Sequence, residues 1–253
     1  MTSHSNVEPW IQLYRPKSLA KIRLFCFPYA GGGATAFFHW QNEVLPEIDV
    51  CPIELPGRGK RFSETPFLSL PPLIEALAQG IEPYLTSPFA FFGHSMGGLV
   101  SIELARYLRK QQMPLPAHLF ISAFRAPQLP DKDPPIHQLP DAEFIHELKR
   151  FNGTPPAVLE NMELMQLLLN TLRADFAVCE TYTWAEEAPL PCPLSVFGGV
   201  QDKEVTRSEL EQWQTQTTRD FSLRMFPGDH FFLVPMQKLL LQAIAQDLRT
   251  YLK

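Results

Sequence analysis

The chain reads Phe-Ala-Phe-Phe-Gly-His-Ser-Met-Gly-Gly from residue 89 to residue 98. Residues 89–92 form an apolar run typical of a short buried strand, and residues 99–108 have the apolar spacing of a helix. Between them lies a Gly-x-Ser-x-Gly motif, which is a weak signal alone but gains meaning from a strand before it and a helix after it. This context predicts a sharp turn that holds Ser95 above the carboxyl edge of a sheet, where its hydroxyl is a candidate nucleophile.

Other apolar runs of strand length lie on both sides of this turn. They cover residues 22–27, 50–55, 118–122, 194–197 and 222–226. Helix-length sequence separates these strands, and such alternation is what a parallel sheet requires. The sequence therefore predicts the α/β class, with a mostly parallel central sheet flanked by helices. We expect one domain over residues 1–253, beginning with a loose polar arm at Met1–Pro16.

One stretch interrupts the alternation, because no convincing strand occurs between Phe124 and Pro193. It begins with several prolines and continues with helical patterns at residues 141–151, 157–160 and 162–182. Helices inserted after a strand of the sheet are typical of a lid, and we expect residues 127–193 to form one. A packing subdomain that only thickens the core is the alternative.

A serine nucleophile needs a base, and His230 is the histidine in the right place. It follows the last predicted strand and precedes the final helix, so it should lie at the same edge of the sheet as Ser95. Asp202 also follows a strand, and its carboxylate can orient the imidazole. The chain order Ser95, Asp202, His230 is that of the α/β-hydrolase fold. Asp229 and Glu204 are weaker candidates for the orienting carboxylate. Asp229 is adjacent to His230 in sequence and usually could not reach its ring nitrogen, and Glu204 lies one turn further from the strand end.

Negative charge that develops on a substrate's carbonyl oxygen needs two hydrogen-bond donors, which together form an oxyanion hole. Met96 supplies one backbone N–H, as the residue after the nucleophile. Ala30, in the glycine-rich loop at residues 28–33, is the candidate for the second. If this loop does not supply an oxyanion donor, it would be a plain turn or a phosphate-binding loop. It lacks the Lys-Ser/Thr ending of a P-loop and the Gly-x-Gly-x-x-Gly spacing of a dinucleotide site.

Composition argues against several classes of protein. The 22 basic and 27 acidic residues give a net charge of −5, which argues against nucleic acid as a partner. The widely spaced Cys26, Cys51, Cys179 and Cys192 form no Cys-x-x-Cys pair, so we expect neither disulfides nor a metal site. No signal peptide and no membrane-spanning apolar run is apparent. We expect a cytoplasmic protein without cofactor or membrane contact, and the sequence leaves its oligomeric state open, a monomer included.

Five segments carry a more specific signal, at residues 24–33, 54–59, 93–98, 124–127 and 228–232. They resemble the type II, or editing, thioesterases that serve nonribosomal peptide and polyketide synthetases. The Pro-Tyr-Ala-Gly-Gly and Pro-Gly-Arg-Gly pieces are more diagnostic than the serine motif, which all esterases share. The resemblance implies hydrolysis of acyl groups from the phosphopantetheine arm of acyl- or peptidyl-carrier proteins. Such hydrolysis removes misprimed or stalled chains, or releases intermediates.

The basic loop Arg58-Gly59-Lys60-Arg61 is a candidate contact for such a carrier. Carrier proteins are typically acidic around the arm, so Arg58, Lys60 and Arg61 could bind the carrier or the arm's phosphate. If the loop does not contact a carrier, we expect it to be a solvated loop in which an arginine pairs with a nearby carboxylate such as Glu54 or Glu64.

Two other functions stay open at this point. One is a general carboxylesterase or lipase that acts on small or lipid esters, which the same three side chains permit. The other is a non-catalytic binding protein on a hydrolase scaffold, since a fold does not determine a function. The sequence gives neither the preferred acyl chain nor the synthase that the protein serves.

Overall fold

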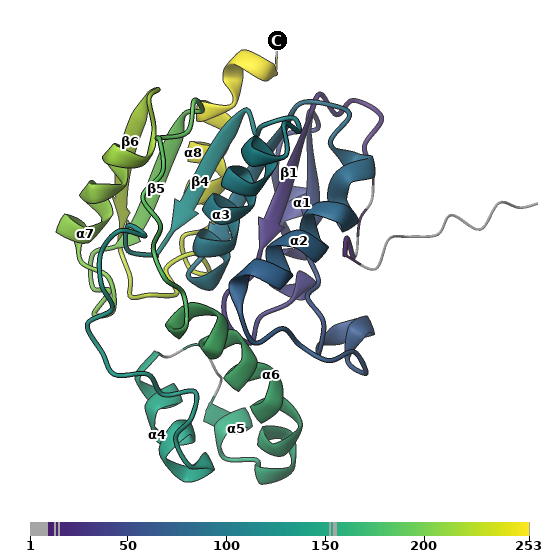
Figure 1. Cartoon of the computed structure of the whole chain (residues 1–253). Coiled ribbons are helices and arrows are strands. Elements are labelled where there is room, and N and C mark those ends of the chain that lie inside the picture. The colour runs from purple at the N-terminus through teal and green to yellow at the C-terminus, as the bar shows by residue number, and fades with distance from the viewer. Residues whose placement is uncertain (1–9, 13, 15, 152, 154–155, 253) are drawn as a thin grey trace, which may run out of the picture.

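A computed structural model describes residues 10–12, 14, 16–151, 153 and 156–252. Its centre is a six-stranded sheet in the order β2-β1-β3-β4-β5-β6, in which all neighbouring strands are parallel (Figure 1). The strands are β1 (Ile22–Phe27), β2 (Ile48–Pro52), β3 (Phe89–His94), β4 (His118–Ser122), β5 (Leu194–Gly199) and β6 (Phe221–Phe226). The predicted α/β class is confirmed.

Helices cover both faces of this sheet. The longer helices are α2 (Leu70–Ile81), α3 (Met96–Lys110), α4 (Asp141–Phe151), α6 (Met162–Glu180) and α8 (Gln237–Asp247). The short ones are α1 (Trp40–Glu43), α5 (Pro156–Leu159) and α7 (Arg207–Glu211), and 3-10 turns include η2 (Gly59–Arg61). Successive strand residues point to opposite faces, so Phe91 packs with α2 and α3 whereas Phe92 packs with α1 and α8.

The segment before β1 differs from the loose arm that the sequence predicts. Residues 1–9 lie outside the described residues, but Trp10 is buried and Ile11 forms an antiparallel bridge with Ile53. The strand predicted at residues 50–55 lies in the sheet only up to Pro52, because the chain beyond it turns to pair with Trp10 and Ile11. The arm is therefore part of the core at this point.

The three helices of the insertion lie beyond the carboxyl ends of the strands, at one end of the molecule (Figure 1). Their outer part has a small apolar cluster of its own, which includes Phe144, Leu148 and Met165. The last turns of α6 belong instead to the main core, where Val178 packs in the same cluster as the side chains of α2 and α3. The helices predicted between Phe124 and Pro193 are thus present, and they divide into an outer and an inner part.

Candidate active site

Ser95 lies in the turn between β3 and α3, with φ 52° and ψ −120°. A non-glycine residue rarely adopts a positive φ, and the strain is held by the hydrogen bond from the Ser95 N–H to the Ser122 carbonyl (2.8 Å). Close packing also fixes the flanking glycines, since a Cβ on Gly97 would lie 2.1 Å from the Phe27 carbonyl oxygen. The sequence folds here into the sharp turn that the motif predicts, with the serine at the carboxyl end of β3.

His230 and Asp202 complete a chain of hydrogen bonds with this serine. The Ser95 Oγ lies 3.0 Å from His230 Nε2, and His230 Nδ1 lies 2.9 Å from Asp202 Oδ2. The other oxygen of Asp202 accepts the backbone N–H groups of Glu204 (2.9 Å) and Val205 (3.2 Å). An ionised Asp202 makes Nδ1 the donor, which leaves Nε2 as the acceptor for the serine hydroxyl.

The two weaker carboxylate candidates are engaged elsewhere. Asp229 Oδ1 accepts the N–H of Phe231 (2.9 Å), and Glu204 pairs with Arg150 (3.2 Å). Burial raises the pKa of Glu204. Of the three carboxylates considered from the sequence, Asp202 is the one placed against the imidazole.

His94 directly precedes the nucleophile in the chain and is enclosed by the protein. It is fully buried, and its Nδ1 lies 2.9 Å from the Ser122 Oγ. Burial, followed by the charge of His230, holds the pKa of His94 well below its ordinary value. With its ring centre 5.5 Å from that of His230, a neutral His94 packs against the candidate base without opposing its positive charge.

The two predicted oxyanion donors border the same cavity as Ser95. Ala30 and Met96 both line it, and neither backbone N–H donates a hydrogen bond to another described residue. The loop that carries Ala30 turns sharply, because the Gly32 N–H bonds to the Tyr29 carbonyl (2.8 Å). Both N–H groups are therefore available to a ligand.

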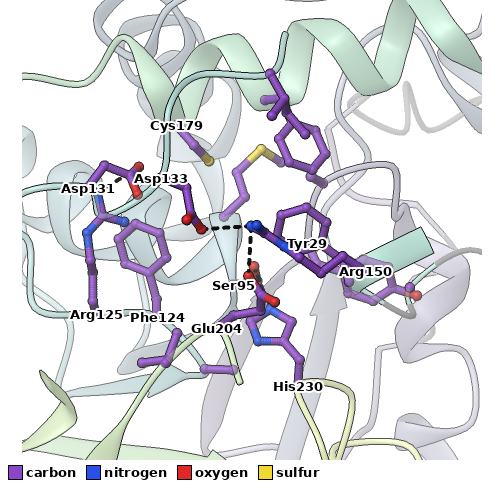
Figure 2. Close-up of a pocket in the computed structure, with 18 of the residues that line it drawn as sticks. Tyr29, Ser95, Phe124, Arg125, Asp131, Asp133, Arg150, Cys179, Glu204 and His230 are labelled. Atoms are coloured by element: carbon purple, nitrogen blue, oxygen red, sulfur yellow. Dashed lines mark hydrogen bonds and ion pairs between the residues drawn. The ribbon is translucent and has the colours of Figure 1, made fainter. Parts of the chain in front are cut away.

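The cavity beside Ser95 and His230 has a volume of about 270 Å³ and is lined by both apolar and charged side chains, and the charged ones include Asp133, Arg150 and Glu204 (Figure 2). The apolar lining comes from the sheet loops and from the insertion, and it includes Tyr29, Phe124, Leu148, Phe151, Leu172, Phe176 and Phe231. Arg150 of α4 reaches across this cavity and pairs with Asp133 (2.7 Å) and with Glu204 (Figure 2). One guanidinium thus links the outer insertion to the loop that carries Asp202.

The structure contradicts the prediction that all three cations of the loop at residues 58–61 are accessible to a carrier protein. Arg58 is buried and pairs with Asp175 of α6 (2.7 Å), and Arg61 is buried, pairs with Glu64 (2.6 Å) and lies over the Trp10 ring. Lys60 is exposed. The pairing of Arg61 with Glu64 is the structural alternative given by the sequence. Asp175 has no such sequence signal, since it is a single acidic residue within an apolar helix.

Other sequence predictions concern features away from this site. In the described part of the chain, no helix is long and apolar enough to cross a membrane, and no cluster of His, Cys, Asp or Glu could hold a metal ion. The four cysteines are free, and three of them are buried.

Comparison with known proteins places the chain in a family. The Thioesterase domain family matches residues 22–250. The gramicidin S biosynthesis protein GrsT of Aneurinibacillus migulanus is 47% identical over 252 residues, which cover 100% of this chain and 98% of GrsT. The solved type II thioesterase BorB, from the borrelidin biosynthetic cluster, is 32% identical with a TM-score of 0.87 and 100% of both chains covered.

A third relative has a name that denotes different chemistry. Linear gramicidin dehydrogenase LgrE of Brevibacillus parabrevis is 46% identical over 253 residues, which cover 99% of this chain and 96% of LgrE. Dehydrogenases that bind a dinucleotide on an α/β sheet use a Gly-x-Gly-x-x-Gly loop after the first strand, and residues 28–33 lack that spacing. The resemblance stated from the sequence is confirmed: this chain belongs to the thioesterase family and has the α/β-hydrolase fold.

Proposed function

We propose that this protein is a type II thioesterase that hydrolyses acyl groups from the phosphopantetheine arm of carrier proteins. The observation that supports this most strongly is the hydrogen-bonded chain Ser95, His230, Asp202 beside a cavity that is partly walled by apolar side chains. Such a site suits an acyl substrate with a reactive carbonyl at one end. The relatives named for biosynthetic pathways support the substrate class.

The first half-reaction forms an acyl-enzyme. The Ser95 Oγ attacks the thioester carbonyl carbon while His230 Nε2 takes the hydroxyl proton. The carbonyl oxygen becomes an oxyanion, which the N–H groups of Ala30 and Met96 stabilise. When the C–S bond breaks, the imidazolium returns the proton to the sulfur, and the arm leaves as a free thiol.

The second half-reaction releases the acid. His230 now takes a proton from water, whose oxygen attacks the acyl carbon and forms a second oxyanion in the same place. Collapse breaks the bond to the Ser95 Oγ, which regains its proton. Every proton is held by the protein or by water, so we propose that the enzyme needs no metal or other cofactor.

The insertion supplies the part of the site that recognises the acyl chain. Phe151, Leu172 and Phe176 line the cavity and offer apolar surface to a hydrocarbon chain. With Arg58 and Arg61 buried, the exposed cations that line the cavity are Lys132, Arg150 and Lys203, and we take them as its rim. We propose that an acidic carrier protein approaches this rim.

The test is incubation with a panel of carrier proteins, each loaded with a different acyl chain, and measurement of their intact mass. We expect some carriers to lose the acyl mass and return to the free-thiol form, with Ser95→Ala as the inactive control. If the carriers stayed loaded while p-nitrophenyl esters were cleaved, the protein would be a general carboxylesterase. Binding of carriers without cleavage of either substrate would identify a non-catalytic binding protein.

A further inference from the structure

The Pro-Gly-Arg-Gly segment is diagnostic of the thioesterase family, but the proposed reaction assigns no role to its residues. Its arginine, Arg58, is 7% exposed and makes two hydrogen bonds of 2.7 Å to Asp175, which is 3% exposed. A buried ion pair is a costly way to join two elements, and replacing such pairs by apolar side chains is often neutral or stabilising. The pair therefore calls for a role other than stability.

Both members of the pair also bond to the loop that carries Ala30. Asp175 Oδ2 accepts the N–H of Gly31 (2.7 Å), and Arg58 Nη1 donates to the carbonyl of Gly32 (2.8 Å). The Gly31 N–H belongs to the peptide group directly after Ala30, and the Gly32 carbonyl lies two peptide groups further along the loop. The ion pair between Arg58 and Asp175 therefore influences the orientation of the Ala30 N–H, because it bonds to the two residues that follow Ala30. We call this ion pair the charged clamp.

The loop has little freedom to bond in another way. Gly31 has φ +76°, and a Cβ at this position would lie 2.5 Å from Leu172 of α6. One turn of α6 before Asp175, the Thr171 hydroxyl donates to the carbonyl of Gly57 (2.7 Å), next to Arg58. Contacts from one face of α6 therefore fix both the Ala30 loop and the loop that presents Arg58.

We propose that Arg58 and Asp175 are positioning residues, which hold the Ala30 N–H where the oxyanion forms. This inference rests on the proposed function and extends it. Neither side chain touches the substrate; each acts through the backbone of residues 30–32. A consequence is that the last turns of α6 are part of the catalytic apparatus rather than a cover over it.

The test uses the full chain with Asp175→Asn and Arg58→Lys. Removing one oxyanion donor costs roughly 10²- to 10³-fold in kcat, and a misplaced donor retains part of its effect, so we expect kcat to fall about 10- to 100-fold. KM for a p-nitrophenyl acyl ester should change little. The affinity for an acyl trifluoromethyl ketone, which forms an oxyanion on Ser95, should fall by the same factor as kcat.

The matched control is Arg224→Lys. Arg224 makes an equally bidentate pair with Asp247 (2.6 Å for both bonds), at the opposite end of the sheet. We expect this variant to keep both kcat and the ketone affinity. The proposal is overturned if Asp175→Asn and Arg58→Lys lower the unfolding midpoint as Arg224→Lys does but keep kcat and ketone affinity.

Further outcomes distinguish loss of the positioning role from misfolding and from failure of the proposed function. If Asp175→Asn does not fold, Arg58→Lys decides, because lysine keeps the charge opposite Asp175 but cannot make the fork of hydrogen bonds. If the wild-type protein forms no ketone adduct at Ser95, the proposed serine mechanism itself fails. An adduct of equal affinity in the wild type and both variants rejects only the positioning role.

Discussion

The side chain of Ser95 makes its one described hydrogen bond to His230, while its backbone carries the strain of the turn. Ser95→Ala should therefore leave the fold intact and lower kcat for acyl-carrier hydrolysis by several powers of ten, as expected when one member of such a set is lost. Circular dichroism checks the fold, and intact mass checks that no acyl-enzyme forms. A variant that retained most of its activity would exclude Ser95 as the nucleophile.

Asp202 acts on the reaction only through the imidazole. Asp202→Asn keeps the shape of the side chain but removes the charge that holds the proton on His230 Nδ1, so the wrong tautomer faces Ser95. We expect kcat to fall roughly 10³- to 10⁴-fold with little change in KM. Glu204→Gln is the matched control, because it changes a nearby carboxylate that bonds to Arg150. If Asp202→Asn were fully active and Glu204→Gln were inactive, Glu204 and not Asp202 would be the carboxylate that orients His230.

At the scale of the elements, the outer and inner parts of the insertion should differ in mobility. We propose that α4 and α5 form a lid, which Arg150 ties to the Asp202 loop through Glu204 and to Asp133. Arg150→Gln should increase amide hydrogen exchange over residues 141–151 and leave β3 and residues 171–180 unchanged. Arg207→Gln, which breaks an exposed helical pair with Glu211, is the control. Equal exchange in α4 and β3 of the wild type would argue against a mobile lid.

Local sequence patterns predicted the elements well, since strand and helix periodicities depend on near neighbours in the chain. They placed Ser95, Asp202 and His230 at strand ends, and parallel strands bring such ends to one edge of the sheet. The same patterns could not give Trp10 or Asp175, because their roles come from partners far away in the sequence. A buried arginine and an exposed one also look alike in a sequence, so the loop at residues 58–61 gives no sign that Arg58 and Arg61 are buried while Lys60 is exposed.

For the whole molecule, acid should weaken the fold through His118. Burial lowers the pKa of His118 to about 4, and its Nε2 lies 2.9 Å from the Ser195 Oγ. An unfolded histidine has a pKa of about 6.5 and binds a proton that the folded protein cannot bind until about pH 4. This stability is complete above pH 6.5 and is lost as the pH falls toward 4. The loss at pH 5 is on the order of 2 kcal/mol.

Urea unfolding at pH 7 and pH 5 measures this effect. His118→Gln removes the titrating group, so its free energy of unfolding should fall less between the two pH values than that of the wild type. His39→Gln, at an exposed position, should behave as the wild type does. If His118→Gln lost as much stability as the wild type, the acid sensitivity would belong to other groups, of which the buried His94 is the first to examine.

The division of α6 between two apolar clusters bears on how such proteins can diversify. Recombination that exchanges residues 127–193 as one block would separate Asp175 and Thr171 from the loops they hold. A crossover placed before Thr171 would exchange the outer wall of the cavity and leave the clamp in its original pairing. Chimeras of the second kind should therefore acquire a new acyl-chain preference and stay active, whereas whole-block chimeras need matching loops from the same parent.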